Sequence, residues 1–167
     1  MTCVVDTNVP LVAKHADEHP TDLADACAQL LEEILDGALP VATDFAGEIV
    51  LEYFHQLNRS GMPTVGDVFA KYVHDMRFTW DDSFLPDIRP RGENDYEVLA
   101  GDDADIDPSD RKFVAVAKVA AVPVVQATDT KWLDWGDVLA RHGVEVHYAH
   151  EPSIRAAYRE KFGREAP

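Results

Sequence analysis

The chain contains little cysteine. Cys3 lies in an apolar run and Cys27 within a helical pattern of the 167-residue sequence. Two such residues provide neither a disulfide framework nor the spacing of a metal site. None of the seven histidines has the spacing of paired zinc ligands, so His55, His74 and His142 are expected at helix surfaces or boundaries. We therefore expect buried thiols in a reducing compartment.

Long apolar runs are also missing. The longest ones, residues 113–117 and 119–125, are far shorter than the roughly 20 residues that a membrane-spanning helix requires. No basic region precedes an apolar one at the N-terminus, which argues against a secretory signal. A chain of this length with 46% apolar residues suits one compact domain. The sequence thus predicts a soluble, cytoplasmic protein with no membrane partner.

Basic residues are scarce. The sequence has 31 Asp and Glu residues against 15 Lys and Arg residues, a formal net charge of −16. Such a surface repels phosphate, so the chain lacks the basic footprint of a stand-alone nucleic-acid-binding protein. Bound metal ions, a few cations gathered beside the site or a basic protein partner would each reconcile nucleic-acid binding with this charge. A plainer explanation is that the acidic surface only reflects solubility or a salty habitat. Both kinds of explanation stay open.

Short apolar runs alternate with helical patterns along the chain. The predicted strands are residues 2–5, 39–43, 122–127 and 144–148. The predicted helices are residues 21–36, 65–76 and 130–142. Further helices are predicted to begin at Asn8 as N-cap, after the cap Asp44 and at Asp107–Asp110. Residues 80–110 are rich in acids and should form mostly an exposed connection. The alternation predicts an α/β fold, a three-layer α/β/α sandwich with a central, mainly parallel sheet. Residues 1–150 make up this domain, and residues 151–167 form a C-terminal helical tail.

Four acids are predicted to meet at one edge of this sheet. Asp6 follows the first strand, and Glu52 lies in the helix after the second. Asp110 opens the helix that precedes the strand 122–127, and Asp129 follows that strand. Clustered carboxylates repel one another, and a hard divalent cation relieves the repulsion because Mg²⁺ and Mn²⁺ take oxygen ligands. Waters held by such a cation can become nucleophiles.

Several of these acids also have a plain structural interpretation. Asp6 suits a turn, Asp110 complements a helix dipole, and Asp107 and Asp129 suit helix caps. Asp107 is the better cap candidate of its segment.

Other candidates are ambiguous in the same way. Glu48 and Glu52 lie four residues apart on one helical face, so only one can be the principal ligand, and the register of Tyr53 and Phe54 favours Glu52. Trp132 and Trp135 could stack on a base, but their helical spacing is more typical of a core.

The order of these motifs resembles the PIN domain of nucleases. The resemblance rests on Val4-Val5-Asp6-Thr7-Asn8, on Glu52 in its helix, on Asp110 ahead of Phe113-Val114-Ala115, and on Ala127-Thr128-Asp129-Thr130-Lys131-Trp132 after a strand. It spans residues 2–148. The segments 48–53 and 107–117 look closer to a bacterial subgroup of uncharacterised PIN-like proteins than to the toxin nucleases of toxin–antitoxin pairs.

The resemblance implies a substrate, a cofactor and a reaction. It implies RNA as the substrate, a requirement for Mg²⁺ or Mn²⁺, and hydrolysis that leaves a 5′-phosphate and a 3′-hydroxyl. The metal-ligand and catalytic positions are Asp6, Glu52, Asp110 and Asp129, with Glu48, Asn8, Asp107 and Lys131 as further candidates. Lys131 departs from the family, since many PIN domains have a second acid there. It could contact the scissile phosphate, replace a second cation or mark weakened catalysis, while Arg111 and Lys112 either hold phosphate or are solvated cations.

Three functions follow from these features. The leading hypothesis is a metal-dependent endoribonuclease, with RNA as partner. The second is a catalytically weak PIN-fold module that binds RNA or protein, and the third is a structure-specific DNA nuclease. A basic, antitoxin-like protein partner and a homodimer both remain open.

Overall fold

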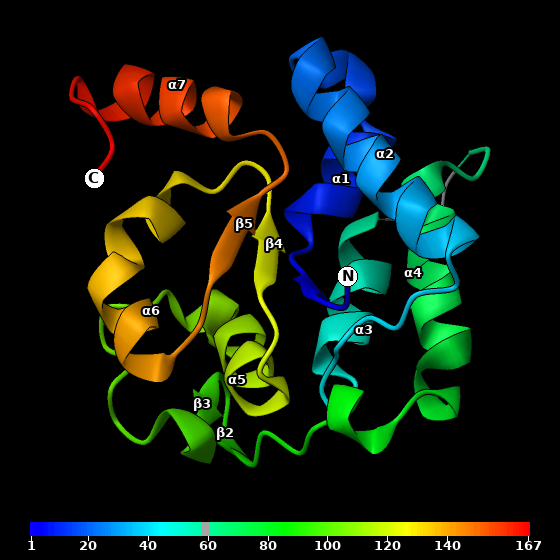
Figure 1. Ribbon diagram of the computed structural model, residues 1–167, viewed down its shortest axis with the longest axis vertical. Coiled ribbons are helices and arrows are strands. Elements are labelled where there is room, and N and C mark those ends of the chain that lie inside the picture. Colours follow the sequence, from blue (N-terminus) through cyan, green and yellow to red (C-terminus); the bar gives the residue numbers. More distant parts are fainter. Residues whose placement is uncertain (58–60) are drawn as a thin grey trace.

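The computed structural model describes residues 1–57 and 61–167 and shows a mixed α/β fold (Figure 1). Within that part of the chain, a small parallel sheet of three strands is accompanied by seven α-helices. In the view of Figure 1, α6 and α7 lie to the left of strands β4 and β5, and α1 to α4 lie to their right. The helices are α1 Asn8–Lys14, α2 Thr21–Asp36, α3 Glu48–Leu57, α4 Val65–Met76, α5 Arg111–Ala120, α6 Gly136–His142 and α7 Glu151–Phe162.

The parallel sheet has the order β1-β4-β5. Its strands are short, and β1 and β4 are buried: β1 is Val4–Val5, β4 is Val124–Gln126 and β5 is Val146–Tyr148. Val4 pairs with Val124, and Val124 pairs in turn with Val146. Three of the four predicted strands are thus present, each shorter than its apolar run. Because all three run in one direction, Asp6 and Asp129 follow the same edge of the sheet.

The predicted strand 39–43 is reduced to a single bridge. Val41 pairs in parallel with Cys3, and the Ala42 amide donates to the Cys3 carbonyl oxygen. The next amide, that of Thr43, donates instead to the Phe84 carbonyl oxygen in the long connection. The backbone therefore leaves the sheet after one residue pair, because the connection supplies its next acceptor.

The helical predictions were accurate where the apolar period was long. Helices α2 and α4 have the predicted bounds, and the carboxylate of Asp44 accepts from the amides of Glu48 and Ile49 at the start of α3. The predicted helix 130–142 is divided into a 3₁₀ helix, Thr130–Trp135, and α6, which ends at Gly143 with φ +68°. The expected helical tail contains α7.

The first helix corrects one prediction. Its N-cap residue is Thr7 and not Asn8, which is the first helical residue. Helix α1 packs closely on α4. Gly66 permits this packing, because a Cβ at this position would clash with the Pro10 carbonyl oxygen. This packing holds the start of α1, and hence Asp6 and Thr7, against the helical side of the core.

The long connection is less regular than the rest, but it is more than the exposed connection that was predicted, because Ile88, Tyr96, Leu99 and Ile106 are buried in the core. It holds an antiparallel hairpin of β2 Pro90–Gly92 and β3 Asp95–Tyr96, and the short 3₁₀ helices Asp82–Phe84, Glu97–Leu99 and Pro108–Asp110. Two further 3₁₀ turns are Ala16–Glu18 and Arg77–Thr79. Asp107 caps the turn that leads into α5, and its side chain accepts from the Ser109 amide, as the sequence indicated.

The core contains both cysteines as free, buried thiols, together with Trp132 and Trp135. The two tryptophans pack with ring centroids 5.1 Å apart, so they belong to the core and offer no face for a base. None of the helices in the described residues combines the length and apolar character needed to cross a lipid bilayer.

Candidate functional site

Asp6 is a buried acid at the end of β1, with 4% of its surface exposed. One carboxylate oxygen, Oδ1, accepts from the Asn8 amide at 3.0 Å, and the other, Oδ2, is buried without a hydrogen-bond partner. Burial raises the pKa of Asp6 to about 8, and the charges of Asp110, Glu52 and Asp129 add to the rise against the lowering effect of the Asn8 bond. The four predicted acids therefore lie close enough to act on one another.

Glu52 on α3 binds a hydroxyl and an ammonium group. The Thr7 hydroxyl donates to Oε1 at 2.7 Å, and the Lys112 ammonium lies 2.6 Å from Oε2. Lys112 also donates to the Ser109 carbonyl oxygen and has only 7% of its side chain exposed. The interpretation of Lys112 as a solvated cation is thus wrong, because α5 turns this side chain inward toward Glu52.

Glu48 lies one helical turn before Glu52 and has a different partner. Its Oε2 accepts from the Tyr96 hydroxyl at 2.5 Å, which ties the start of α3 to the hairpin. The two glutamates are therefore separated in their contacts: Glu52 adjoins Thr7 and Lys112, whereas Glu48 adjoins Tyr96. The choice of Glu52 over Glu48 as the principal ligand stays a prediction.

Asp110 is the second acid with a buried, unbonded oxygen. Its Oδ2 has no hydrogen-bond partner, because the nearest cation, the Lys131 ammonium, is 3.6 Å away and beyond hydrogen-bonding distance. Burial raises the pKa of Asp110 to about 6, and the charge of Asp129 contributes to the rise while Lys131 opposes it. Asp110 is the residue just ahead of α5, so it is also placed to complement the dipole of that helix.

The Lys131 ammonium lies close to three carboxylates. It lies 2.8 Å from Asp107, 3.2 Å from Asp129 and 3.6 Å from Asp110. Burial lowers the pKa of Lys131, but the Asp107 hydrogen bond and the nearby Asp129 outweigh it and hold the pKa above its usual range. The same ion pair, with the Ser109 hydroxyl, lowers the pKa of Asp107 to about 2.

Asp129 is both a site candidate and a helix cap. Its Oδ1 accepts from the Lys131 amide at the start of the 3₁₀ helix, which agrees with the predicted capping role. The buried side chain of Gln126 fixes the turn, since its Oε1 accepts from the Asp129 amide and its Nε2 donates to the Asp129 carbonyl oxygen. A residue predicted only as part of a strand therefore sets the position of the acid.

Asn8 connects the ends of the two strands that the acids Asp6 and Asp129 follow. Its side-chain oxygen accepts from the Ala127 amide at 2.8 Å, just beyond β4, while its own amide donates to Asp6. Asn8 therefore holds the end of β1 and the end of β4 in a fixed relation. The sequence included Asn8 among the candidates, and the structure gives it a positioning contact.

The remaining charged candidates have structural roles. Arg111 contacts the Ile106 carbonyl oxygen and lies 3.5 Å from Asp103, so it is not a solvated cation. His142 is buried at the end of α6, and its ring lies 2.6 Å from the Asp102 carbonyl oxygen and 3.1 Å from the Lys118 ammonium. The expectation that His142 lies at a helix boundary is correct, but it is not on the surface.

The suitability of the site for a cation can be judged from its oxygens. Among residues 1–57 and 61–167, no three His, Cys, Asp or Glu side chains are grouped as a formed metal site. The acids nevertheless interact, since three of them raise the pKa of Asp6. Ammonium groups hold Glu52 and Asp129. The buried, unbonded oxygens of Asp6 and Asp110 are hard donors that suit Mg²⁺ or Mn²⁺.

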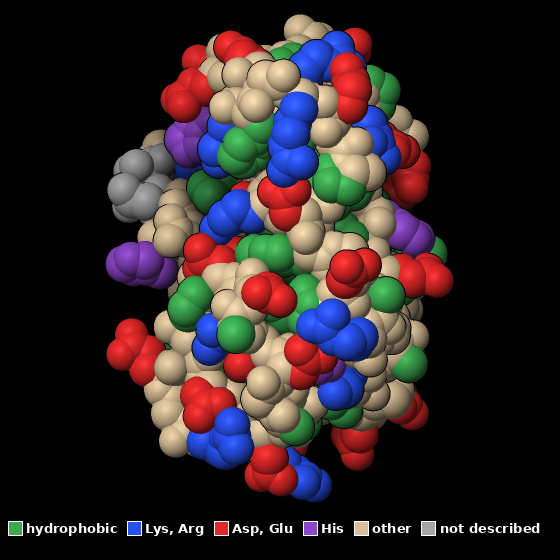
Figure 2. All heavy atoms as spheres, turned by 90° about the vertical axis from the view of Figure 1, so that its left-hand side faces the viewer, with side chains coloured by type: hydrophobic (Ala, Val, Ile, Leu, Met, Phe, Trp, Pro, Cys, Tyr) green, Lys and Arg blue, Asp and Glu red, His purple; other side chains and the backbone are tan. Residues whose placement is uncertain are grey.

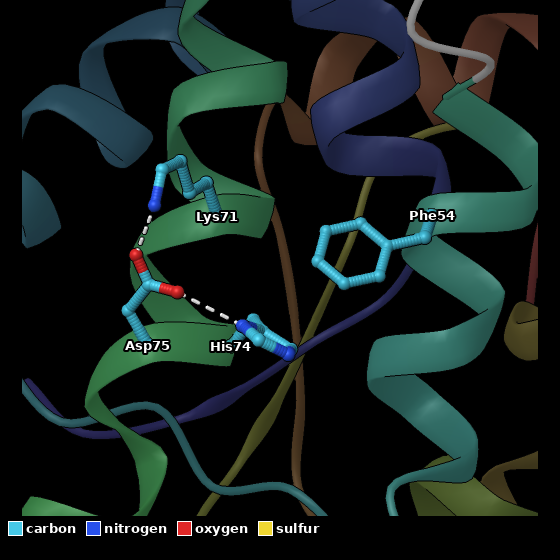
Figure 3. A pocket seen from close by; sticks show the side chains of 4 residues that line it. All are labelled: Phe54, Lys71, His74 and Asp75. Carbon is cyan, nitrogen blue, oxygen red and sulfur yellow. Dashed lines mark hydrogen bonds and ion pairs between the residues drawn. The ribbon is translucent and has the colours of Figure 1, made fainter.

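A separate pocket lies between α3 and α4 and contains none of these acids. It has a volume of about 530 Å³ and is lined by Phe54, Lys71, His74 and Asp75 (Figure 3). The Asp75 carboxylate binds the Lys71 ammonium and, at 2.9 Å, the His74 ring, so its charged groups satisfy one another. The pocket therefore offers less unsatisfied chemistry than the acid cluster.

No protein-family model matches the chain, and no curated protein and no solved structure is significantly similar to it.

Proposed function

We propose that the protein is a metal-dependent endoribonuclease with a PIN-like, three-layer α/β/α fold. The observation that supports this most is the pair of buried carboxylate oxygens, one on Asp6 and one on Asp110, that have no hydrogen-bond partner. Buried polar atoms are normally paired, and an unpaired carboxylate oxygen beside other acids has the chemistry of a cation ligand. The sheet order, with Val41 beside β1 and β1 beside β4, is compatible with the proposed fold.

Asp6, Glu52, Asp110 and Asp129 are the proposed ligands. A divalent cation bound there supplies a lowered pKa for an attacking water and stabilises negative charge on the departing 3′-oxygen. The protein contributes position: Asn8 holds Asp6 by its amide and Ala127 by its side chain. Thr7 and Lys112 orient Glu52 through one bond to each of its oxygens.

The substrate class is proposed from the resemblance to PIN domains. RNA must approach a chain with a net charge of −16, so a cation at the site has to offset local repulsion. Lys131 is the cation of this region with 40% of its side chain exposed, which leaves it accessible to a phosphate. A basic, antitoxin-like partner that completes the groove is consistent with the same charge balance.

The test is cleavage of single-stranded RNA by purified protein with Mn²⁺ or Mg²⁺. Asp6→Asn should remove the activity, because it removes a ligand, while the circular dichroism spectrum stays that of the wild type. Asp105→Asn, an equal change of charge at an exposed acid of the connection, should keep full activity. Cleavage that persists in chelator and in the Asp6→Asn variant would exclude the mechanism.

One observation favours the second function, an interaction module without catalysis. Lys112 and Lys131 already neutralise much of the acid cluster, as they would in a protein that needs no cation. Under this alternative, Mn²⁺ would not raise the melting temperature of the wild type. A rise with Mn²⁺ that disappears in Asp6→Asn favours the nuclease.

A further inference from the structure

We propose that the site binds one divalent cation, because the Lys131 ammonium occupies the position at which a second cation would neutralise Asp107, Asp110 and Asp129. This inference rests on the proposed function. It goes further by assigning a stoichiometry and by giving Lys131 the role of a positioning residue.

The contacts of Lys131 resemble those of a bound cation. Its ammonium lies within 3.6 Å of three carboxylates that come from two separate segments of the chain. The backbone holds it there, since its amide donates to the Asp129 carboxylate at 3.1 Å. The ammonium also lies 5.9 Å from the Trp135 ring centroid, within the range of a cation–π contact. A tethered cation of this kind cannot diffuse away.

The unbonded oxygens indicate where the remaining cation binds. Asp6 Oδ2 and Asp110 Oδ2 have no hydrogen-bond partner, whereas the other carboxylates of the cluster are held by lysines. Asp110 belongs to both groups, because the Oδ2 that lacks a hydrogen-bond partner is also the oxygen that lies 3.6 Å from the Lys131 ammonium. The cluster thus has a part neutralised by Lys131, a part neutralised by Lys112 at Glu52, and Asp6, which forms no ion pair within the described residues.

The charge balance of the cluster also indicates one divalent cation. Five carboxylates face two ammonium groups, so one divalent cation brings the cluster close to neutrality. A second divalent cation beside Lys131 would leave an excess of positive charge in a partly buried site, and one that displaced Lys131 would break its three ion pairs. Because charge that is buried without a partner is costly, the second cation is excluded in the wild type.

Manganese titration followed by electron paramagnetic resonance measures the stoichiometry without relying on activity. Wild type should bind one Mn²⁺ ion, and Lys131→Asp, which replaces the ammonium by a ligand, should bind two. The matched control is Lys161→Asp, an equal change of charge at an exposed position of α7, which should still bind one.

The outcomes separate the two proposals. Two Mn²⁺ ions in the wild type, or one in Lys131→Asp, would overturn the role of Lys131 while leaving the metal site intact. No binding by any of the three proteins would overturn the proposed metal site, and the inference with it.

A second variant covers the case in which Lys131→Asp does not fold. Lys131→Met removes the positive charge without adding a negative one, so it should bind the first Mn²⁺ about tenfold more tightly through loss of repulsion between cations. If Lys131 only supported the turn, binding would weaken instead, and that result would overturn the inference.

Discussion

Replacing Asp110 by Asn tests whether the acids form a shared site, and it does so without knowledge of the substrate. In the metal-free protein, Asp110 is buried and lies near Asp129, which raises its pKa from 3.8 to about 6. Unfolding releases the carboxylate into water and separates the charges. The ionised Asp110 therefore destabilises the metal-free fold, and Asn removes this charge while keeping the shape of the side chain.

The size of the effect follows from the pKa. A rise from 3.8 to about 6, at about 1.4 kcal/mol per pH unit, sets an upper bound of about 3 kcal/mol. Because the substituted asparagine remains a buried polar group and Lys131 loses one weak partner, we expect Asp110→Asn to stabilise the protein by about 1 to 2 kcal/mol. For a domain of this size, that is a rise of about 2 to 8 °C in melting temperature.

The pH dependence gives the prediction a second readout. The folded-state pKa of Asp110 is above the unfolded one, so the carboxyl costs stability as the pH rises from about 4 to about 6. The advantage of the variant should be complete at pH 8 and absent near pH 4. Mn²⁺ at pH 8 should reverse the order, since the wild type binds the ion only when folded and the variant has lost a ligand.

Asp107→Asn is the matched control, with the opposite sign. The pKa of Asp107 is lowered by its bonds to Lys131 and Ser109, so the charge is favourable and its loss should lower the melting temperature slightly. Thermal melts of the three proteins in chelator and in Mn²⁺ decide the matter. If Asp110→Asn melts no higher than the wild type in chelator at pH 8, Asp110 is merely a residue that complements the helix dipole.

Three further predictions concern the neighbours of these acids. Asn8→Ala should lower the free energy of unfolding by about 1 to 2 kcal/mol in urea melts, since it leaves the buried Ala127 amide unpaired; an unchanged midpoint would contradict this. Lys112→Met should cost about 3 kcal/mol at pH 7, because Glu52 loses a buried partner; a stabilised variant would show that the pair is dispensable. Because the pKa of Asp6 is about 8, binding of Mn²⁺ at pH 7 should release about one proton and at pH 9 almost none, and calorimetry in buffers of different ionisation enthalpy should detect the difference.

The sequence predicted those elements whose hydrophobic pattern is local. Helix α2 has the predicted bounds because its apolar residues repeat over four turns and bury one face. The run 39–43 has the composition of a strand, yet its amides are divided between Cys3 and Phe84. Strand formation depends on a partner of matching length, and a single sequence does not contain that information.

The acids could be predicted because their position follows from topology. In a parallel sheet, residues after successive strands share an edge, so Asp6 and Asp129 could be placed together from the order of elements. The two lysines could not be placed in this way. Whether a lysine on a helix reaches solvent or turns inward depends on contacts with distant segments, as Lys112 shows by pairing with Glu52.

Asn8 illustrates how a distant contact overrides a local preference. An asparagine near a helix start favours the N-cap, where its side chain accepts from its own helix. In this chain the side chain accepts from Ala127 instead, and Thr7 takes the cap position without a side-chain bond to the helix backbone. The Ala127 amide is buried and would lack a hydrogen-bond acceptor without the Asn8 side chain.

The acidic surface bears on how a nucleic acid could reach this site. On the face that carries α6 and α7, acidic side chains are scattered among lysines and arginines (Figure 2). Two arginines of α7 are engaged there, Arg155 with Glu151 and Arg159 with Glu165. Such pairs do not attract phosphate from a distance, so this face is an unsuitable route for RNA. Under the proposed function, the attraction would then come from the cluster itself, once a divalent cation has joined Lys131, or from a basic partner. The two sources differ in their dependence on salt. A partner held by surface charge dissociates as ionic strength rises, whereas a cation bound by buried carboxylates remains.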